Sequence, residues 1–130
     1  MLQYPRVALD FMNRDHADFV TLRKQLLGLL AAQSLDNEMD KQLDALLEHT
    51  HHHFAEEERQ MQACRFPPYP MHKAEHDSVL ADMAAKIERW KTERDTNALQ
   101  QWLEQDLGDW FITHVSTMDF VTARFIASQQ

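Results

Sequence analysis

The chain has 130 residues, a formal net charge of −8, one cysteine, two glycines and four prolines. This length fits a single domain over residues 1–130, and the few glycines and prolines disfavour an all-β fold with many tight turns. The negative charge argues against nucleic acid or an anionic membrane surface as a partner. A lone Cys64, no long apolar run and no signal-peptide pattern lead us to expect a cytoplasmic protein without membrane insertion.

Apolar residues recur at helical spacing along four stretches of the chain. After an arm of about residues 1–10, we expect helices over about residues 11–33, 37–64, 71–94 and 97–126. A turn at Ser34–Asn37, a proline-rich cluster at Arg65–Pro70 and a helix cap at Asp95–Asn97 separate them. Four long helices with short connections predict an all-α fold, an up-down-up-down four-helix bundle with a short N-terminal arm.

Histidines and carboxylates occur in pairs with helical spacing on either side of the proline-rich cluster. His53 and Glu57 are four residues apart, as are His72 and His76, so each pair lies on one face of its helix. Imidazole and carboxylate groups that converge from adjacent helices are typical of a metal site.

The predicted topology places further candidates at the same depth in the bundle. In this topology, the connection between the first two helices and the connection between the last two lie at the same end of the bundle. Counted along each helix from that end, seven side chains lie at a depth of 16 to 22 residues. At about 1.5 Å per residue, they fall within one slab. These residues are His16, His53, Glu57, His72, His76, His114 and Asp119. Their common level strengthens the prediction of a metal site.

The order and spacing of these residues resemble the hemerythrins, in particular the single-domain bacterial type. The resemblance covers most of the chain and rests on five fragments in order. They are the isolated His16, the string from His53 to Met61, Pro67 five residues before His72, the pair His72 and His76, and the pair His114 and Asp119. In that family, a four-helix bundle surrounds a non-haem di-iron centre that binds O2 reversibly.

The resemblance implies two iron ions joined by an oxo or hydroxo bridge. One iron would be bound by His72, His76 and His114, the other by His16 and His53, and Glu57 and Asp119 would bridge both. If both irons are octahedral, these ligands and the bridge leave one open position, on the iron with two histidines. O2 or a small anion such as azide would bind there. A ligand set rich in imidazole favours reversible binding over oxidative chemistry.

Two other classes of function stay open. The same centre could serve a di-iron oxidase, a peroxidase or a nitric-oxide-handling enzyme, although the only added acid–base residue beside it is His49. The protein could also be a metal buffer or an interaction module. The sequence does not identify a protein partner.

Five side chains near the predicted centre are candidates for a ligand pocket: Phe19, His49, Phe54, Trp110 and Phe111. The aromatic ones suit an apolar gas pocket, although any bundle core would also contain them. His49 occurs where many hemerythrins have tyrosine. We expect it to be largely buried, either simply hydrogen-bonded to a neighbour or as a polar group in the pocket.

The spacing of His114 and Asp119 indicates a local irregularity. Residues five apart lie about 140° apart on a regular α-helix, so both cannot point straight at one centre. A π-helical turn would bring them closer to alignment, and such turns concentrate at functional sites. The alternative is a regular helix with Asp119 leaning inward through its side-chain rotamer.

Overall fold

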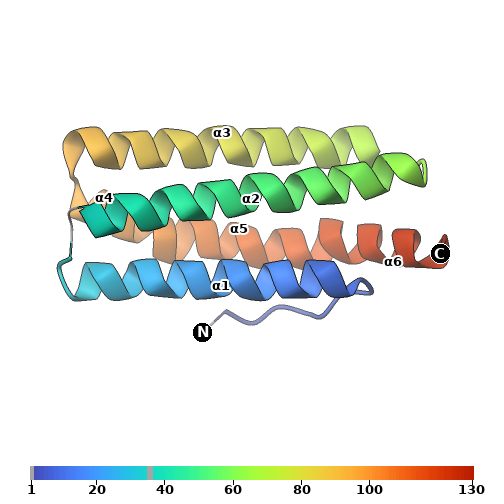
Figure 1. Cartoon of the computed structure of the whole chain (residues 1–130), viewed down its shortest axis with the longest axis horizontal. Helices are drawn as coiled ribbons and strands as arrows, with labels where there is room; N and C mark the ends of the chain where they lie inside the picture. Colours follow the sequence, from blue (N-terminus) through green and yellow to red (C-terminus); the bar gives the residue numbers. More distant parts are fainter. Residues whose placement is uncertain (1, 35–36) are drawn as a thin grey trace.

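The structure, a computed structural model, describes residues 2–34 and 37–130, and in these residues every regular element is a helix. The first three helices are α1 (Asp10–Ala31), α2 (Asn37–Ala63) and α3 (Tyr69–Glu93). The fourth is one continuous helix made of α4 (Thr96–Gln101), η1 (Trp102–Asp106), α5 (Leu107–His114), η2 (Val115–Asp119) and α6 (Phe120–Ser128), of which η1 and η2 are π-helical. Figure 1 shows the helices side by side along one long axis. The predicted up-down-up-down bundle is confirmed.

The connections follow the local chemistry of the chain. Helix α3 begins at Tyr69, before the expected residue 71, because Pro70 lies in the first helical turn, where its missing amide hydrogen costs nothing. Arg94 ends α3 with a left-handed backbone (φ 53°), and the Asp95 side chain then accepts a hydrogen bond from the Ala98 amide at 3.1 Å. The turn predicted at Ser34–Asn37 includes residues 35 and 36, which lie outside the described residues.

The expected π-helical turn between His114 and Asp119 is confirmed, since η2 spans Val115–Asp119. The segment η1 was not predicted from the sequence. A π-helical turn changes the hydrogen-bond pattern, and nearby side chains bind backbone carbonyl groups at both segments. Arg23 donates hydrogen bonds to the Leu103 carbonyl at 2.8 Å and the Glu104 carbonyl at 3.2 Å, and the Thr117 hydroxyl donates to the Thr113 carbonyl at 2.6 Å.

The hydrophobic core extends through the bundle, and one of its ends surrounds a group of buried polar side chains. Trp90 and Trp102 lie in this core and are each 3% exposed. The arm before α1 packs on the bundle, because the Asn13 side chain bonds both the amide and the carbonyl of Val7. None of the helices in the described part of the chain has the length and apolar character needed to cross a membrane.

Candidate metal centre

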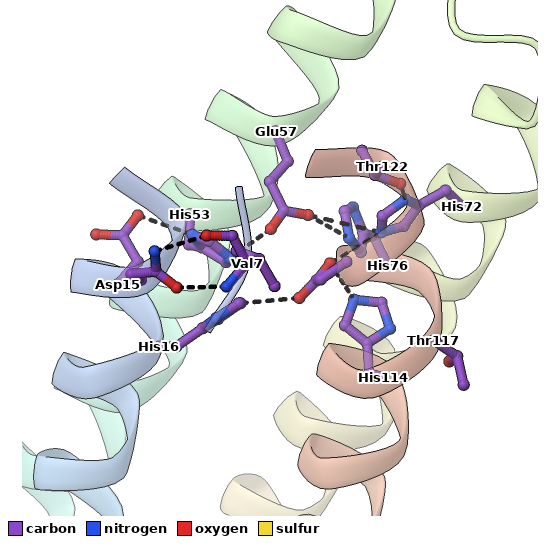
Figure 2. Close-up of polar contacts among 12 residues, drawn as sticks. Val7, Asp15, His16, His53, Glu57, His72, His76, His114, Thr117 and Thr122 are labelled. Atoms are coloured by element: carbon purple, nitrogen blue, oxygen red, sulfur yellow. Dashed lines mark hydrogen bonds and ion pairs between the residues drawn. The ribbon is translucent and has the colours of Figure 1, made fainter. Parts of the chain in front are cut away.

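All seven side chains predicted as metal ligands lie in the interior of the bundle, between 0 and 7% exposed. His16 comes from α1, His53 and Glu57 from α2, and His72 and His76 from α3. The fourth helix supplies His114 at the end of α5 and Asp119 at the end of η2. In Figure 2 the side chains of Glu57 and the five histidines converge from the different helices.

The two carboxylates lie between two groups of imidazoles. Glu57 Oε2 is 2.6 Å from Nε2 of His53, while its Oε1 is 3.2 Å from Nε2 of His76. Asp119 Oδ2 is 2.9 Å from Nε2 of His16, while its Oδ1 is 3.1 Å from Nε2 of His114. Each carboxylate therefore presents one oxygen to each group of imidazoles.

The donor atoms form two sets that share both carboxylates. In each set, one donor atom per residue lies within 4.8 Å of the others. The first set is Glu57, His72, His76, His114 and Asp119, and the second is His16, His53, Glu57 and Asp119. Two neighbouring cations could be held by these sets.

Many of these buried donor atoms lack hydrogen bonds, although they are close together. In the described part of the chain, no hydrogen-bond partner is present for Nε2 of His53, His72, His76 and His114, or for either oxygen of Glu57. Buried polar atoms without a hydrogen bond are costly, and a cation at their common point would satisfy them. The chemistry of the residues therefore fits a metal centre of nitrogen and oxygen donors.

Four of the five imidazoles are oriented by a hydrogen bond at the other ring nitrogen. Nδ1 of His53 lies 2.7 Å from Asp15, that of His76 2.8 Å from Glu58, and that of His114 3.0 Å from Glu75. Nδ1 of His72 lies 2.8 Å from the Thr122 hydroxyl oxygen. A carboxylate accepts the Nδ1 proton and so leaves Nε2 of a neutral imidazole as a lone pair directed at the centre.

The histidines and carboxylates also shift one another's pKa. Burial alone would lower the pKa of His53, but the charge of Glu57 and the hydrogen bond with Asp15 outweigh it and raise that pKa to about 10. Burial likewise opposes the effect of Asp119 on His114, whose pKa is raised to about 9. Burial and the charge of Asp119 would raise the pKa of Glu57, yet His53 holds it at about 2. The buried carboxylates therefore favour positive charge on His53 and His114, as they would favour a bound cation.

A small cavity of about 20 Å³ lies beside the centre, and all five residues predicted for the ligand pocket line it. Phe19 and Phe111 stack face to face at 4.5 Å, and Trp110 stacks on His114 at 4.9 Å. His49 is half-buried rather than largely buried, and its Nε2 lies 3.1 Å from the Asp15 carbonyl oxygen, to which it donates a hydrogen bond. The expectation of large burial is therefore wrong, whereas the expected hydrogen bond is present and the side chain lines the cavity.

The sequence reasoning missed Asp15, Glu75, Thr122 and the aromatic contact of Tyr4 with His16 (ring centroids 6.3 Å apart). It also did not predict the contact of Glu58 with His76. One signal was present: Asp15, Glu58 and Glu75 each adjoin an inward-facing ligand in sequence. A position next to an inward-facing residue lies about 100° around the helix, toward its flank, where it can reach the neighbouring helix.

Comparison with known proteins identifies the family. Residues 7–126 match the family described as the Hemerythrin HHE cation binding domain. The chain is 32% identical to a bacteriohemerythrin of Aquifex aeolicus, over 88% of this chain and 86% of that protein. It is 36% identical to a bacteriohemerythrin of Ralstonia nicotianae, over 88% of this chain and 79% of that one. A crystal structure of a hemerythrin mutant has the same fold, with a TM-score of 0.77, 22% identity and coverage of 98% and 99% of the two chains. The chain belongs to the hemerythrin HHE cation-binding domain family.

Proposed function

We propose that this protein holds two non-haem iron ions and uses them to bind O2 reversibly. Membership of the hemerythrin family and the buried histidine and carboxylate cluster support this function. The proposed ligands of one iron are His72, His76 and His114, those of the other are His16 and His53, and Glu57 and Asp119 bridge the two.

The observation that carries the proposal is the division of the carboxylate oxygens. Glu57 and Asp119 each have one oxygen beside the imidazoles of one group and the second oxygen beside the other group. This arrangement suits a carboxylate that bridges two cations, and it would serve a single cation poorly. With an added oxo or hydroxo bridge, octahedral irons retain one open position.

The position of the cavity supports an opening on the iron of His16 and His53. Both of these histidines line the cavity, whereas only His114 of the other three does. When bound, the iron pair supplies the electrons needed for reversible O2 binding. The protein contributes a nearly dry space: Phe19, Phe54 and Phe111 form aromatic walls that exclude water and the protons it carries. A small anion such as azide would compete for the same space.

The enzymatic alternative depends on His49. An oxidase or peroxidase needs a proton donor beside the open position, and His49 is a protonatable side chain that lines the cavity. The cytoplasmic location, the absence of nucleic-acid binding and the absence of membrane insertion stay predictions.

The test is spectroscopy of the iron-loaded protein in air and under vacuum, with metal analysis. We expect two irons per chain and a visible band that appears in air and bleaches under vacuum. Irreversible oxidation with turnover of an added reductant would establish the enzyme instead. Asp119→Ala should lose one or both irons, while the same change at the exposed Asp18 on α1 should lose none. An Asp119→Ala protein with two irons and unchanged spectra would overturn the ligand assignment.

A further inference from the structure

Trp110 separates the small cavity beside the centre, called the inner cavity below, from a larger groove on the surface of the bundle. The groove has a volume of about 310 Å³, lies between α3 and the fourth helix, and is lined by Met83, Trp102 and Leu107 among others. Trp110 lines both spaces, and among the described residues no other side chain does. The indole ring is thus the partition between the surface groove and the cavity beside His16 and His53.

Contacts with other rings hold the indole of Trp110 in place. It stacks on His114 with ring centroids 4.9 Å apart, and its edges meet Phe54 at 6.2 Å and Phe19 at 6.4 Å. Its Nε1–H is buried, and no described residue accepts a hydrogen bond from it. A buried donor without an acceptor disfavours the closed position. If the ring turned toward the groove, the indole N–H could reach water, so opening would recover a hydrogen bond.

The mouth of the groove is acidic. Three carboxylates line it: Glu75, Asp82 and Asp106. The exposed Asp82 has Lys86 at 3.7 Å, a contact that solvent screens, and Asp106 has no ion pair in the described part of the chain. A negative mouth lowers the local concentration of small anions and leaves the concentration of a neutral diatomic gas unchanged.

From this geometry we infer that Trp110 gates a route through which neutral diatomic ligands reach the open position from the groove between α3 and the fourth helix. This inference rests on the proposed function, because the open position belongs to the iron pair. The acidic mouth makes the route selective: O2 passes freely, while azide and other anions enter slowly.

A gate has a kinetic signature that differs from that of a pocket wall. A barrier on the route slows association and release by the same factor, so the equilibrium Kd does not change. If the gate is open in roughly 0.1–10% of the molecules, ligand passes at that fraction of the rate through a permanently open route. Removal of the ring should therefore raise both rates on the order of tenfold or more. A wall residue, by contrast, changes Kd mainly through release.

The first experiment measures O2 and azide association and release by stopped flow on the iron-loaded wild type, Trp110→Ala and Trp110→Phe. We expect both rates to rise together in the alanine variant and, to a smaller extent, in the phenylalanine variant. For proteins with equal iron content, each rate should change by a larger factor than Kd does. A changed Kd with an unchanged association rate would make Trp110 a wall only. Unchanged rates would place the route elsewhere, for instance at His49, and would also overturn the inference.

The charge of the mouth is tested separately, at a residue that touches no proposed ligand. Asp106→Asn should raise the azide association rate roughly twofold at low salt, as expected for one exposed charge, and leave the O2 rate unchanged. Asp109→Asn is the matched control, since Asp109 is exposed on the same helix but does not line the groove. An equal effect of both variants on azide would remove the selective role of the mouth.

A readout independent of iron chemistry is xenon, a monatomic apolar gas that enters dry cavities. Crystals pressurised with xenon should show it in the inner cavity of the wild type. In Trp110→Ala they should show a continuous row of sites from the groove to that cavity. Two separate sites in Trp110→Ala would overturn the gate. Failure of the proposed function would be seen separately, as a wild-type protein without O2 and azide spectra. The xenon experiment would still test whether Trp110 closes the route, because it does not depend on iron.

Discussion

Asp15 offers the sharpest test of how the protein holds its metal, because it orients His53 without belonging to the proposed ligand set. The Asp15 carboxylate accepts the Nδ1 proton of His53 at 2.7 Å, and the side chain of Asp15 is 29% exposed. Asp15→Asn keeps an acceptor oxygen of the same shape and removes the charge. We expect the imidazole to become a weaker ligand, and the iron of His16 and His53 to be bound less tightly.

The expected magnitude follows from the geometry. Loss of a residue that orients a metal ligand costs roughly 10- to 100-fold in metal affinity, or about 1.4 to 2.8 kcal/mol. Because Asp15 is partly exposed, solvent screens its charge, and because asparagine can still accept a hydrogen bond, the loss should lie near the lower limit. Glu75→Gln should have a similar effect on the other iron, since Glu75 is 35% exposed and 3.0 Å from His114.

The assay is titration of the loaded protein with a competing chelator, followed by iron analysis and azide spectra. In Asp15→Asn, the chelator concentration that removes the first iron should fall about tenfold, and azide binding should be lost with that iron. Asp18→Asn is the control, because Asp18 is exposed and has no described partner. Equal chelator resistance of the wild type and Asp15→Asn would refute the argument that this hydrogen bond strengthens His53 as a ligand.

Three further predictions concern the same centre. In the metal-free protein, the raised pKa of His53 (about 10, against 6.5) adds stability that is complete below about pH 6.5 and lost as the pH approaches 10. The melting temperature of the metal-free protein should therefore fall from pH 6.5 to 9. The melting temperature of the iron-loaded protein should not fall, because its imidazoles bind the metal in the neutral form. Parallel curves of melting temperature against pH for the two proteins would contradict this prediction. Phe111→Ala should speed autoxidation by admitting water, and it should lower the free energy of unfolding by about 3–5 kcal/mol. Below its melting temperature the variant should retain two irons. An unchanged autoxidation rate would show that Phe111 does not exclude water. His49→Leu should slow autoxidation severalfold without loss of iron, because it removes the polar side chain from the cavity wall; an unchanged rate would exclude that path for water.

The sequence was most informative where chemistry and helical geometry give a periodic signal. The proposed ligand residues occur at spacings that a bundle brings to one level, so their convergence was predictable. The π-helical segment η2 was predictable for the same reason, since His114 and Asp119 are five residues apart and both face inward. No such pair marks η1, whose carbonyls are bound by Arg23 from a distant helix, and that contact depends on tertiary packing.

Contacts between helices were harder to predict, because they depend on the rotation of one helix against another. Glu75 and Asp77 flank His76 in the same way, yet only Glu75 reaches His114, while Asp77 pairs with Lys73 on the surface. Likewise, Trp110 was predictable as a cavity residue. Its place between two cavities, with its N–H unpaired, required the structure.

The carboxylates outside the centre follow the order of the helices around the bundle. Asp15 of α1 bonds a histidine of α2, Glu58 of α2 bonds one of α3, and Glu75 of α3 bonds one of α5. The fourth helix offers no such carboxylate to His16 of α1, whose buried Nδ1 has no hydrogen-bond partner in the described part of the chain. The series of carboxylates is therefore incomplete at one position, at a histidine proposed to bind the iron with the open position.

Aromatic rings replace the missing carboxylate at His16. The edges of Tyr4 and Phe111 meet the His16 ring, with centroids 6.3 and 5.7 Å apart and near-perpendicular planes. These contacts orient the imidazole as a hydrogen bond would, although with less energy. Asp15 already brings one carboxylate to the cavity wall, and a further one at His16 would add charge and water where, in the proposed function, protons would promote the loss of O2 as superoxide. His16 is therefore held by apolar contacts, without a further charge beside the proposed gas site.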